Sequence, residues 1–104
     1  MVSESEVLQF AREVGDRFHP EKVILFGSHA MGTGGEDSDV DLLVIMDHDS
    51  RSAQQALDIR RSIKRAFPLD LIVRTPAEVR RRLEAGDPFI SESLAHGRVL
   101  YARD

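Results

Sequence analysis

The chain has 104 residues and a formal net charge of −4, with 41% hydrophobic and 31% charged residues. These values are typical of a folded chain and exclude an intrinsically disordered one, so we expect a single domain over residues 1–104. The absence of cysteine excludes disulfide frameworks, thiolate zinc sites and cysteine nucleophiles. The apolar runs are too short for a membrane span and the first residues do not resemble a secretion signal, so we expect a cytoplasmic protein.

The first predicted element is an amphipathic helix over residues 4–18. Ser3 followed by Glu6 forms a capping-box pattern, which is typical of a helix start. His19 precedes Pro20 and therefore avoids helical geometry, so the helix ends there. The apolar side chains of this segment recur at helical spacing: Val7, Phe10, Ala11, Val14 and Phe18.

Two buried strands are predicted next, over residues 22–26 (KVILF) and 40–46 (VDLLVIM). Asp41 is the acid that interrupts the apolar pattern of the second strand. The loop between the strands begins at Gly27-Ser28 and is rich in glycine. Its glycines are Gly27, Gly32, Gly34 and Gly35.

A second helix is predicted over residues 51–67, because apolar residues recur there mostly on one helical face and Pro68 follows. A third strand is predicted over residues 69–73 (LDLIV), where Asp70 is the single acid among apolar neighbours. Four phenylalanines are predicted to pack in the core: Phe10, Phe18, Phe67 and Phe89.

The last part of the chain is predicted to form two short helices and a strand. Residues 75–78 (TPAE) combine an N-cap, a first-turn proline and a third-position acid. Asp87-Pro88 starts the second helix, which ends near Gly97, and residues 98–102 form a strand at a sheet edge. This order of elements predicts a small α/β domain, with helices packed on a mixed sheet of about three to five strands.

Opposite charges are segregated along the chain. Residues 36–49 hold six acids and no Lys or Arg, whereas residues 51–82 hold nine Lys or Arg and three acids. This pattern predicts a cation-collecting loop beside a surface that meets an anionic partner. The basic stretch, which includes Arg80, Arg81 and Arg82, is equally typical of solvated helix faces, and both interpretations stay open.

Three aspartates in the predicted strands point to a metal site. Asp39 and Asp41 are two residues apart, so their side chains point to the same face of a strand. Neighbouring carboxylates repel and are costly to bury, whereas Mg²⁺ takes carboxylate and phosphate oxygens as ligands. If the strand that contains Asp70 is adjacent, a third carboxylate joins, which suits one or two Mg²⁺ ions. Taken alone, Asp-x-Asp is also typical of acids in a solvated turn.

Gly27 and Ser28 are candidate phosphate ligands. We expect the strand to turn through glycine into a helix, which would present free backbone N–H groups and a positive helix end to a phosphate, and the serine adds a hydroxyl donor. A Walker phosphate loop is excluded, because no lysine follows the second glycine of residues 27–32. A calcium EF-hand at residues 37–48 is also excluded, because leucine and histidine replace the required glycine and glutamate.

The combination of these motifs is more specific than its parts. Residues 27–32 read GSHAMG and residues 38–42 read SDVDL. This arrangement resembles the G-S-x-A-x-G and S-D-x-D-L signature of the DNA polymerase β-like nucleotidyltransferase superfamily, and the length resembles its minimal nucleotidyltransferases. The resemblance spans about residues 5–75. Many members have arginine at the position of Met31, so this chain lacks one positive charge beside the phosphate-binding loop.

The resemblance implies a reaction and a set of site residues. Asp39 and Asp41 would bind Mg²⁺ and the phosphates of the nucleotide, and Gly27 and Ser28 would hold its triphosphate. Asp70 matches the third metal-linked carboxylate, which would position or deprotonate the attacking hydroxyl. The implied reaction transfers a nucleoside monophosphate, expected to be AMP from ATP, and releases pyrophosphate.

The resemblance also implies a partner. Minimal nucleotidyltransferases accompany HEPN-domain toxins, and in that family they act as antitoxins by transferring AMP to a tyrosine of the HEPN ribonuclease. We therefore expect a protein adenylyltransferase with a HEPN partner, without a membrane or direct nucleic-acid contact; a homo-oligomer is compatible with the sequence. Two alternatives remain: a catalytically weak module that neutralises its partner by occlusion, and a nucleotidyltransferase that acts on a small molecule or an RNA end.

Overall fold

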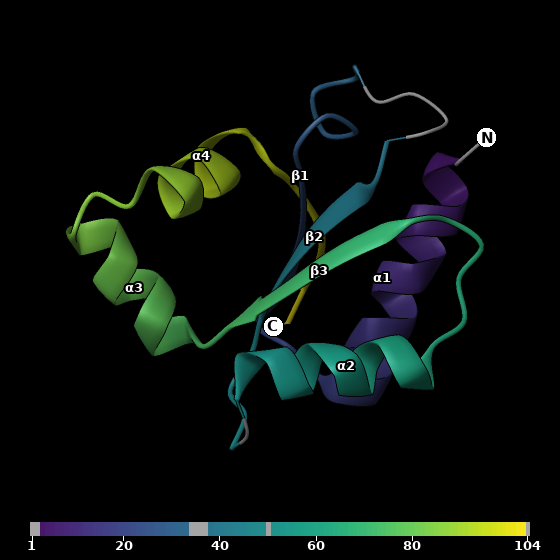
Figure 1. The fold of residues 1–104 in the computed structure, drawn as a ribbon, viewed down its shortest axis with the longest axis horizontal. Helices are drawn as coiled ribbons and strands as arrows, with labels where there is room; N and C mark the ends of the chain where they lie inside the picture. Colours follow the sequence, from purple (N-terminus) through teal and green to yellow (C-terminus); the bar gives the residue numbers. More distant parts are fainter. Residues whose placement is uncertain (1–2, 34–37, 50, 104) are drawn as a thin grey trace.

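The computed structural model describes residues 3–33, 38–49 and 51–103, and within them the chain forms a four-stranded mixed sheet with helices on both faces (Figure 1). The strand order is β3-β2-β1-β4. Strands β2 and β3 are parallel, and β1 is antiparallel to both β2 and β4. The elements are α1 (Glu4–Phe18), β1 (Lys22–Phe26), β2 (Val40–Ile45), α2 (Ser52–Ser62), β3 (Leu69–Arg74), α3 (Pro76–Glu84), α4 (Pro88–His96) and β4 (Arg98–Ala102). The predicted fold class is therefore confirmed.

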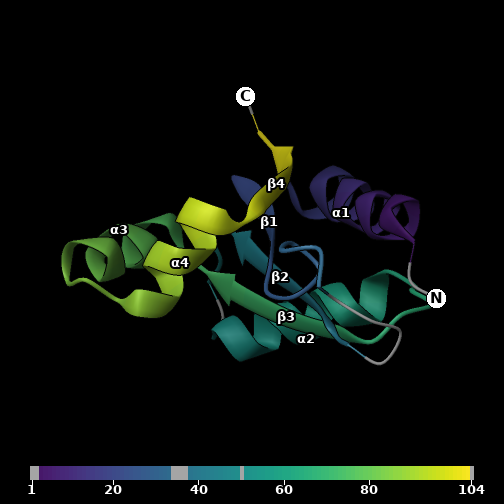
Figure 2. The ribbon, with the colours of Figure 1, turned by 90° about the horizontal axis from the view of Figure 1, so that it is seen from above.

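The two faces of the sheet are covered by different helices (Figures 1 and 2). Helices α1 and α2 pack on one face, where Val23, Leu42 and Leu71 are among the buried strand residues. Helices α3 and α4 pack on the other face, which buries Ile24 and Leu43. Alternate residues of a strand point to opposite faces, so each apolar strand contributes to both cores.

The predicted helix starts are confirmed by their caps. The Ser3 Oγ accepts a hydrogen bond from the Glu6 N–H at 3.2 Å. The Thr75 Oγ1 accepts a hydrogen bond from the N–H of Glu78, the third residue of α3, at 3.2 Å. The Asp87 carboxylate accepts a hydrogen bond from the N–H of Ile90, the third residue of α4, also at 3.2 Å. These side chains satisfy backbone donors that lack a partner within the helix. No helix in the described ranges is both long and apolar enough to span a membrane.

The second helix is shorter than predicted. Helix α2 ends at Ser62, and Ile63 adopts an extended conformation with φ −128° and ψ 123°. Ile63 and Phe67 are nevertheless buried, and the Phe67 ring packs edge-on against that of Phe10 with centroids 5.9 Å apart. The helical spacing of apolar residues over 51–67 therefore identified buried side chains, but an irregular segment buries the last of them on its way to β3.

Strand β4 lies at the sheet edge, as predicted, and glycines allow its close approach to the rest of the fold. A Cβ on Gly15 of α1 would lie 2.3 Å from the Tyr101 ring of β4. A Cβ on Gly97 would lie 2.3 Å from the Ser93 carbonyl oxygen and 2.6 Å from the Ile24 Cγ2. The close approach of Gly97 to Ile24 places the end of α4 against β1, beside the loop that leads to β2.

Candidate functional site

The strand register places two of the predicted carboxylates opposite each other. Asp41 of β2 lies opposite Asp70 of the parallel strand β3, and Asp39 lies just before β2. Val40 and Leu42 point into the core under α1 and α2, so the Asp41 side chain lies on the face that carries α3 and α4. The predicted adjacency of the two strands is confirmed, and it places acids from separate parts of the chain at one end of the sheet.

Gly27 lies directly against the Asp41 carboxylate. Phe26 pairs with Asp41 across the antiparallel β1–β2 ladder, so the next residue turns beside this side chain. Gly27 has a φ of +75°, which favours glycine, and a Cβ placed on it would lie 2.2 Å from the Asp41 Oδ2. A glycine is therefore required here both by the backbone conformation and by the approach of a carboxylate.

Residues 28–33 form hydrogen-bonded turns rather than the helix that was expected to follow Gly27. The Thr33 N–H donates to the Ser28 carbonyl at 2.9 Å, and the Met31 N–H donates to the Gly27 carbonyl at 3.2 Å. Within the described ranges, the backbone N–H groups of Ser28, His29 and Ala30 have no protein acceptor. These three donors, with the Ser28 hydroxyl, are the groups that the turn offers to phosphate. The further loop glycines, Gly34 and Gly35, and the acids Glu36 and Asp37 lie outside the described residues.

His29 lies inside the motif loop, and its position in the sequence alone did not place it among the predicted site residues. Its Nε2 lies 3.1 Å from the backbone oxygen of Ser38, so it links the turn after β1 to the segment that carries Asp39. The signal that points to it is its position immediately after Gly27-Ser28. His48 and His96 lie elsewhere, in the loop after β2 and at the end of α4.

The carboxylates are electrostatically coupled. Burial raises the pKa of Asp41, and the negative charges of Asp70 and Asp39 raise it further, whereas His29 acts in the opposite direction. Asp41 is half-buried, while Asp39 and Asp70 are exposed. Each carboxylate therefore disfavours ionisation of Asp41, and a bound cation would remove this repulsion.

The side-chain donors fit a metal ion whose coordination is completed by the substrate. In the described ranges, no group of three or more His, Asp or Glu side chains is assembled to hold a metal ion. Mg²⁺ is usually held by one or two carboxylates with water and substrate phosphates, so it does not require a preformed cage of three. Asp39 and Asp41 can supply such a pair, and the neighbouring turn supplies phosphate donors.

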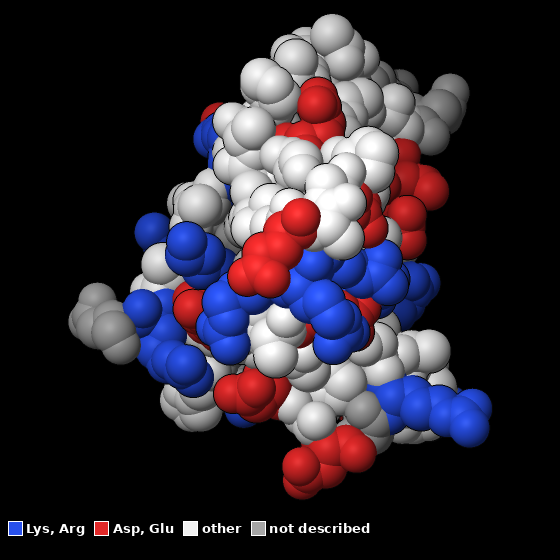
Figure 3. All heavy atoms as spheres, turned by 90° about the vertical axis from the view of Figure 1, so that its left-hand side faces the viewer, with Lys and Arg blue, Asp and Glu red and all other residues white. Residues whose placement is uncertain are grey.

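The basic segment is partly structural. Arg82 of α3 contacts the carboxylates of Glu78 at 3.0 Å and Asp87 at 3.1 Å. Arg80 and Arg81 are exposed on the same helix and have no ion pair within the described residues. Figure 3 shows the side of the molecule where α3 lies, with a band of Lys and Arg side chains that have Asp and Glu side chains among them. The ion pairs of Arg82 support the solvated-helix interpretation for this residue.

The family of the chain is shown by comparison with known proteins. Residues 7–101 match the family model of the nucleotidyltransferase domain, so the chain belongs to this family. No curated protein matches the chain at a significant level.

Solved structures share the fold at low sequence identity. A protein from Sulfolobus solfataricus that is assigned as a nucleotidyltransferase is 22% identical, with a TM-score of 0.67 over 95% of this chain and 79% of that chain. A toxin–antitoxin with AMP-PNP is 18% identical, with a TM-score of 0.60 over 99% of this chain and 76% of that one. A mutant of the toxin–antitoxin MntA–HpeT that carries two Asp-to-Glu substitutions is 15% identical, with a TM-score of 0.55 over the same shares, 99% and 76%.

Proposed function

We propose that the chain transfers a nucleoside monophosphate, AMP from ATP, to a hydroxyl group with the help of Mg²⁺. The observation that carries this proposal is the convergence of Asp41, Asp70 and Gly27 at one end of the sheet. The neighbour that holds AMP-PNP supports ATP as the donor, since it shares the fold.

In this reaction the turn after β1 holds the triphosphate through its free N–H groups and the Ser28 hydroxyl. Asp39 and Asp41 would hold the metal, which when bound would offset the negative charge that develops on the α-phosphate. Asp70 orients the acceptor hydroxyl and takes its proton. The acceptor oxygen forms a bond to the α-phosphorus while the bond from that phosphorus to the bridging oxygen breaks, and pyrophosphate leaves.

We further propose that the acceptor is a tyrosine hydroxyl of a HEPN toxin and that the chain acts as its antitoxin. Two neighbours in fold are toxin–antitoxin structures, which supports this class of partner. Transfer of AMP to the toxin would add a charged group to it and block its activity.

Occlusion without chemistry is the second candidate, and one residue favours it. Met31 stands where many family members have arginine, and 63% of its surface is exposed beside the phosphate-binding turn. A neutral side chain attracts triphosphate less than a guanidinium does. Action on a small molecule or an RNA end is the third candidate and is distinguished by the same experiment.

The test is transfer of label from α-³²P-ATP with Mg²⁺ to the HEPN partner. Wild type is expected to label the partner, and the double variant with Asp39→Asn and Asp41→Asn is expected not to. The matched control changes Asp47 and Asp49 to Asn, two exposed acids beyond the end of β2. It is expected to transfer label as wild type does.

The other outcomes separate the candidates. Inhibition of the toxin that survives the Asp39→Asn and Asp41→Asn changes, without label on the partner, would support occlusion and refute transfer to the toxin. Label on RNA or on a metabolite, with an unmodified HEPN partner, would support the third candidate.

A further inference from the structure

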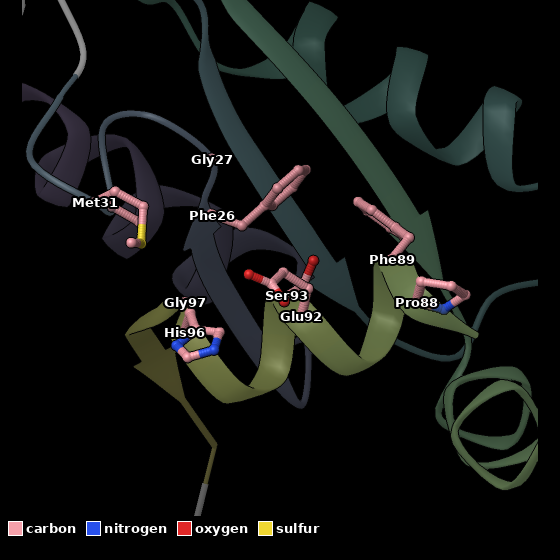
Figure 4. A pocket seen from close by; sticks show the side chains of 10 residues that line it. Phe26, Gly27, Met31, Pro88, Phe89, Glu92, Ser93, His96 and Gly97 are labelled. Carbon is pink, nitrogen blue, oxygen red and sulfur yellow. The ribbon is translucent and has the colours of Figure 1, made fainter. Parts of the chain in front are cut away.

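A cavity of about 410 Å³ lies between the turn after β1 and helix α4 (Figure 4). Its size is within the usual range of small-molecule sites, about 300–1,000 Å³. Phe26 and Phe89 contact each other edge to face in its wall, with ring centroids 5.1 Å apart and planes at 81°. Met31 enters from the turn, and Glu92 and His96 come from α4. The phenylalanine predicted to be core at position 89 is instead 36% exposed in this wall.

The cavity borders the carboxylate site. Gly27, which contacts the Asp41 carboxylate, also lines the cavity. Phe26, the strand partner of Asp41, provides one of its two rings. Asp41 and Phe26 lie on the sheet face that carries α4. A ligand whose phosphates lie on the turn after β1 can therefore reach the cavity with its other end.

The chemistry of the walls suits a flat aromatic ring with a polar edge. Two phenylalanines and a methionine provide apolar and aromatic surface, on which a base can stack. Glu92 and His96 are four residues apart and therefore lie on one side of α4. Within the described ranges neither side chain has a hydrogen bond or an ion pair, so both are available to a ligand.

We propose that this cavity receives the base of the nucleotide donor, an inference that rests on the proposed nucleotidyl transfer. The base stacks against Phe89 and Phe26, and the Glu92 carboxylate accepts a hydrogen bond from an N–H group at its edge. Met31 then has a role that an arginine at this position would not have, because its side chain covers the base. Part of the affinity for the donor is thereby moved from the phosphates to the base.

The test compares two ligands, Mg·ATP and Mg·tripolyphosphate, by isothermal titration calorimetry. Phe89→Ala is expected to weaken ATP binding about five- to tenfold and to leave tripolyphosphate binding unchanged, since base–aromatic stacking contributes an effect of this order. Leu83→Ala is the matched control, because Leu83 is an apolar α3 residue with 40% exposure outside the cavity. It is expected to change neither affinity. Glu92→Gln is expected to weaken ATP binding alone, and melting temperatures verify that each variant folds.

Several results would overturn the proposal. If wild type binds both ligands equally and Phe89→Ala changes neither affinity, the base lies elsewhere, while the proposed transfer stands. If Phe89→Ala leaves both affinities unchanged but raises the KM for the protein acceptor, the cavity receives the acceptor and not the base. If wild type binds neither ligand, the proposed function fails together with this inference.

Discussion

Replacement of Gly27 by alanine tests the close contact on which the site depends. The new Cβ would lie 2.2 Å from the Asp41 Oδ2 and 3.2 Å from its Cγ. Because these atoms are at the end of a side chain that can rotate, we expect the carboxylate to move away from the turn rather than the backbone to shift. The cost in folding free energy is then mainly that of alanine at positive φ, about 1–2 kcal/mol.

Two other glycines isolate the backbone contribution. Gly32 and Gly86 have φ values of +77° and +78°, and a Cβ on either would meet no atom within 4 Å. Gly32→Ala and Gly86→Ala are therefore expected to lose about 1–2 kcal/mol in urea unfolding, as Gly27→Ala does. Gly86 lies between α3 and α4, outside the site, so its variant also serves as the control for ligand binding.

The functional effect is expected to separate these variants. Loss of the support that orients a metal ligand typically weakens metal binding about 10- to 100-fold. Titration with Mg²⁺ and a non-hydrolysable ATP analogue is therefore expected to show this loss for Gly27→Ala and wild-type affinity for Gly86→Ala. Equal affinities in the two variants would refute the proposed contact between the turn and the Asp41 carboxylate.

Two further predictions concern stability. Since burial and its acidic neighbours raise the pKa of Asp41, the contribution of this group to stability falls as the pH rises from the ordinary value of 3.8 through the raised pKa. Without divalent metal, the Asp41→Asn variant should therefore be more stable than wild type at neutral pH in urea unfolding. This difference should disappear below pH 3.8. A variant that is less stable than wild type at neutral pH would contradict the prediction. Mg²⁺ with an ATP analogue should stabilise wild type alone. Gly97→Ala should lower the unfolding free energy by about 1–3 kcal/mol, because its Cβ would meet the backbone; unchanged denaturation midpoints would refute that close packing.

The electrostatic strain at the carboxylates is consistent with a site that is arranged for a charged substrate rather than for stability. Asp41 lies between the like charges of Asp39 and Asp70, which raise its pKa together with burial. Removal of such repulsion commonly stabilises a protein and impairs its function. The Asp41→Asn variant therefore links the stability measurement to the label-transfer experiment, where loss of activity is expected.

Local sequence patterns determined most of the secondary structure of this protein. Ser3, Thr75 and Asp87 cap helices where they were predicted to, because a side chain three residues before a free N–H can reach it without tertiary help. The spacing of Gly27-Ser28 and Asp39-x-Asp41 also indicated the family, and the family model confirms it. The end of α2 was not predictable in this way, since Ile63 is buried equally well from an extended segment.

Tertiary structure alone decided which of these residues meet. The parallel register of β2 and β3 sets Asp70 opposite Asp41, and the antiparallel register of β1 sets Gly27 against the same carboxylate. It also placed Phe89 in a cavity wall, although its apolar character had predicted the core. Strand pairing and helix packing join residues that are distant along the chain, and no periodicity or capping pattern encodes such contacts. The candidate site residues could therefore be named from the sequence, whereas their arrangement in space depends on the fold.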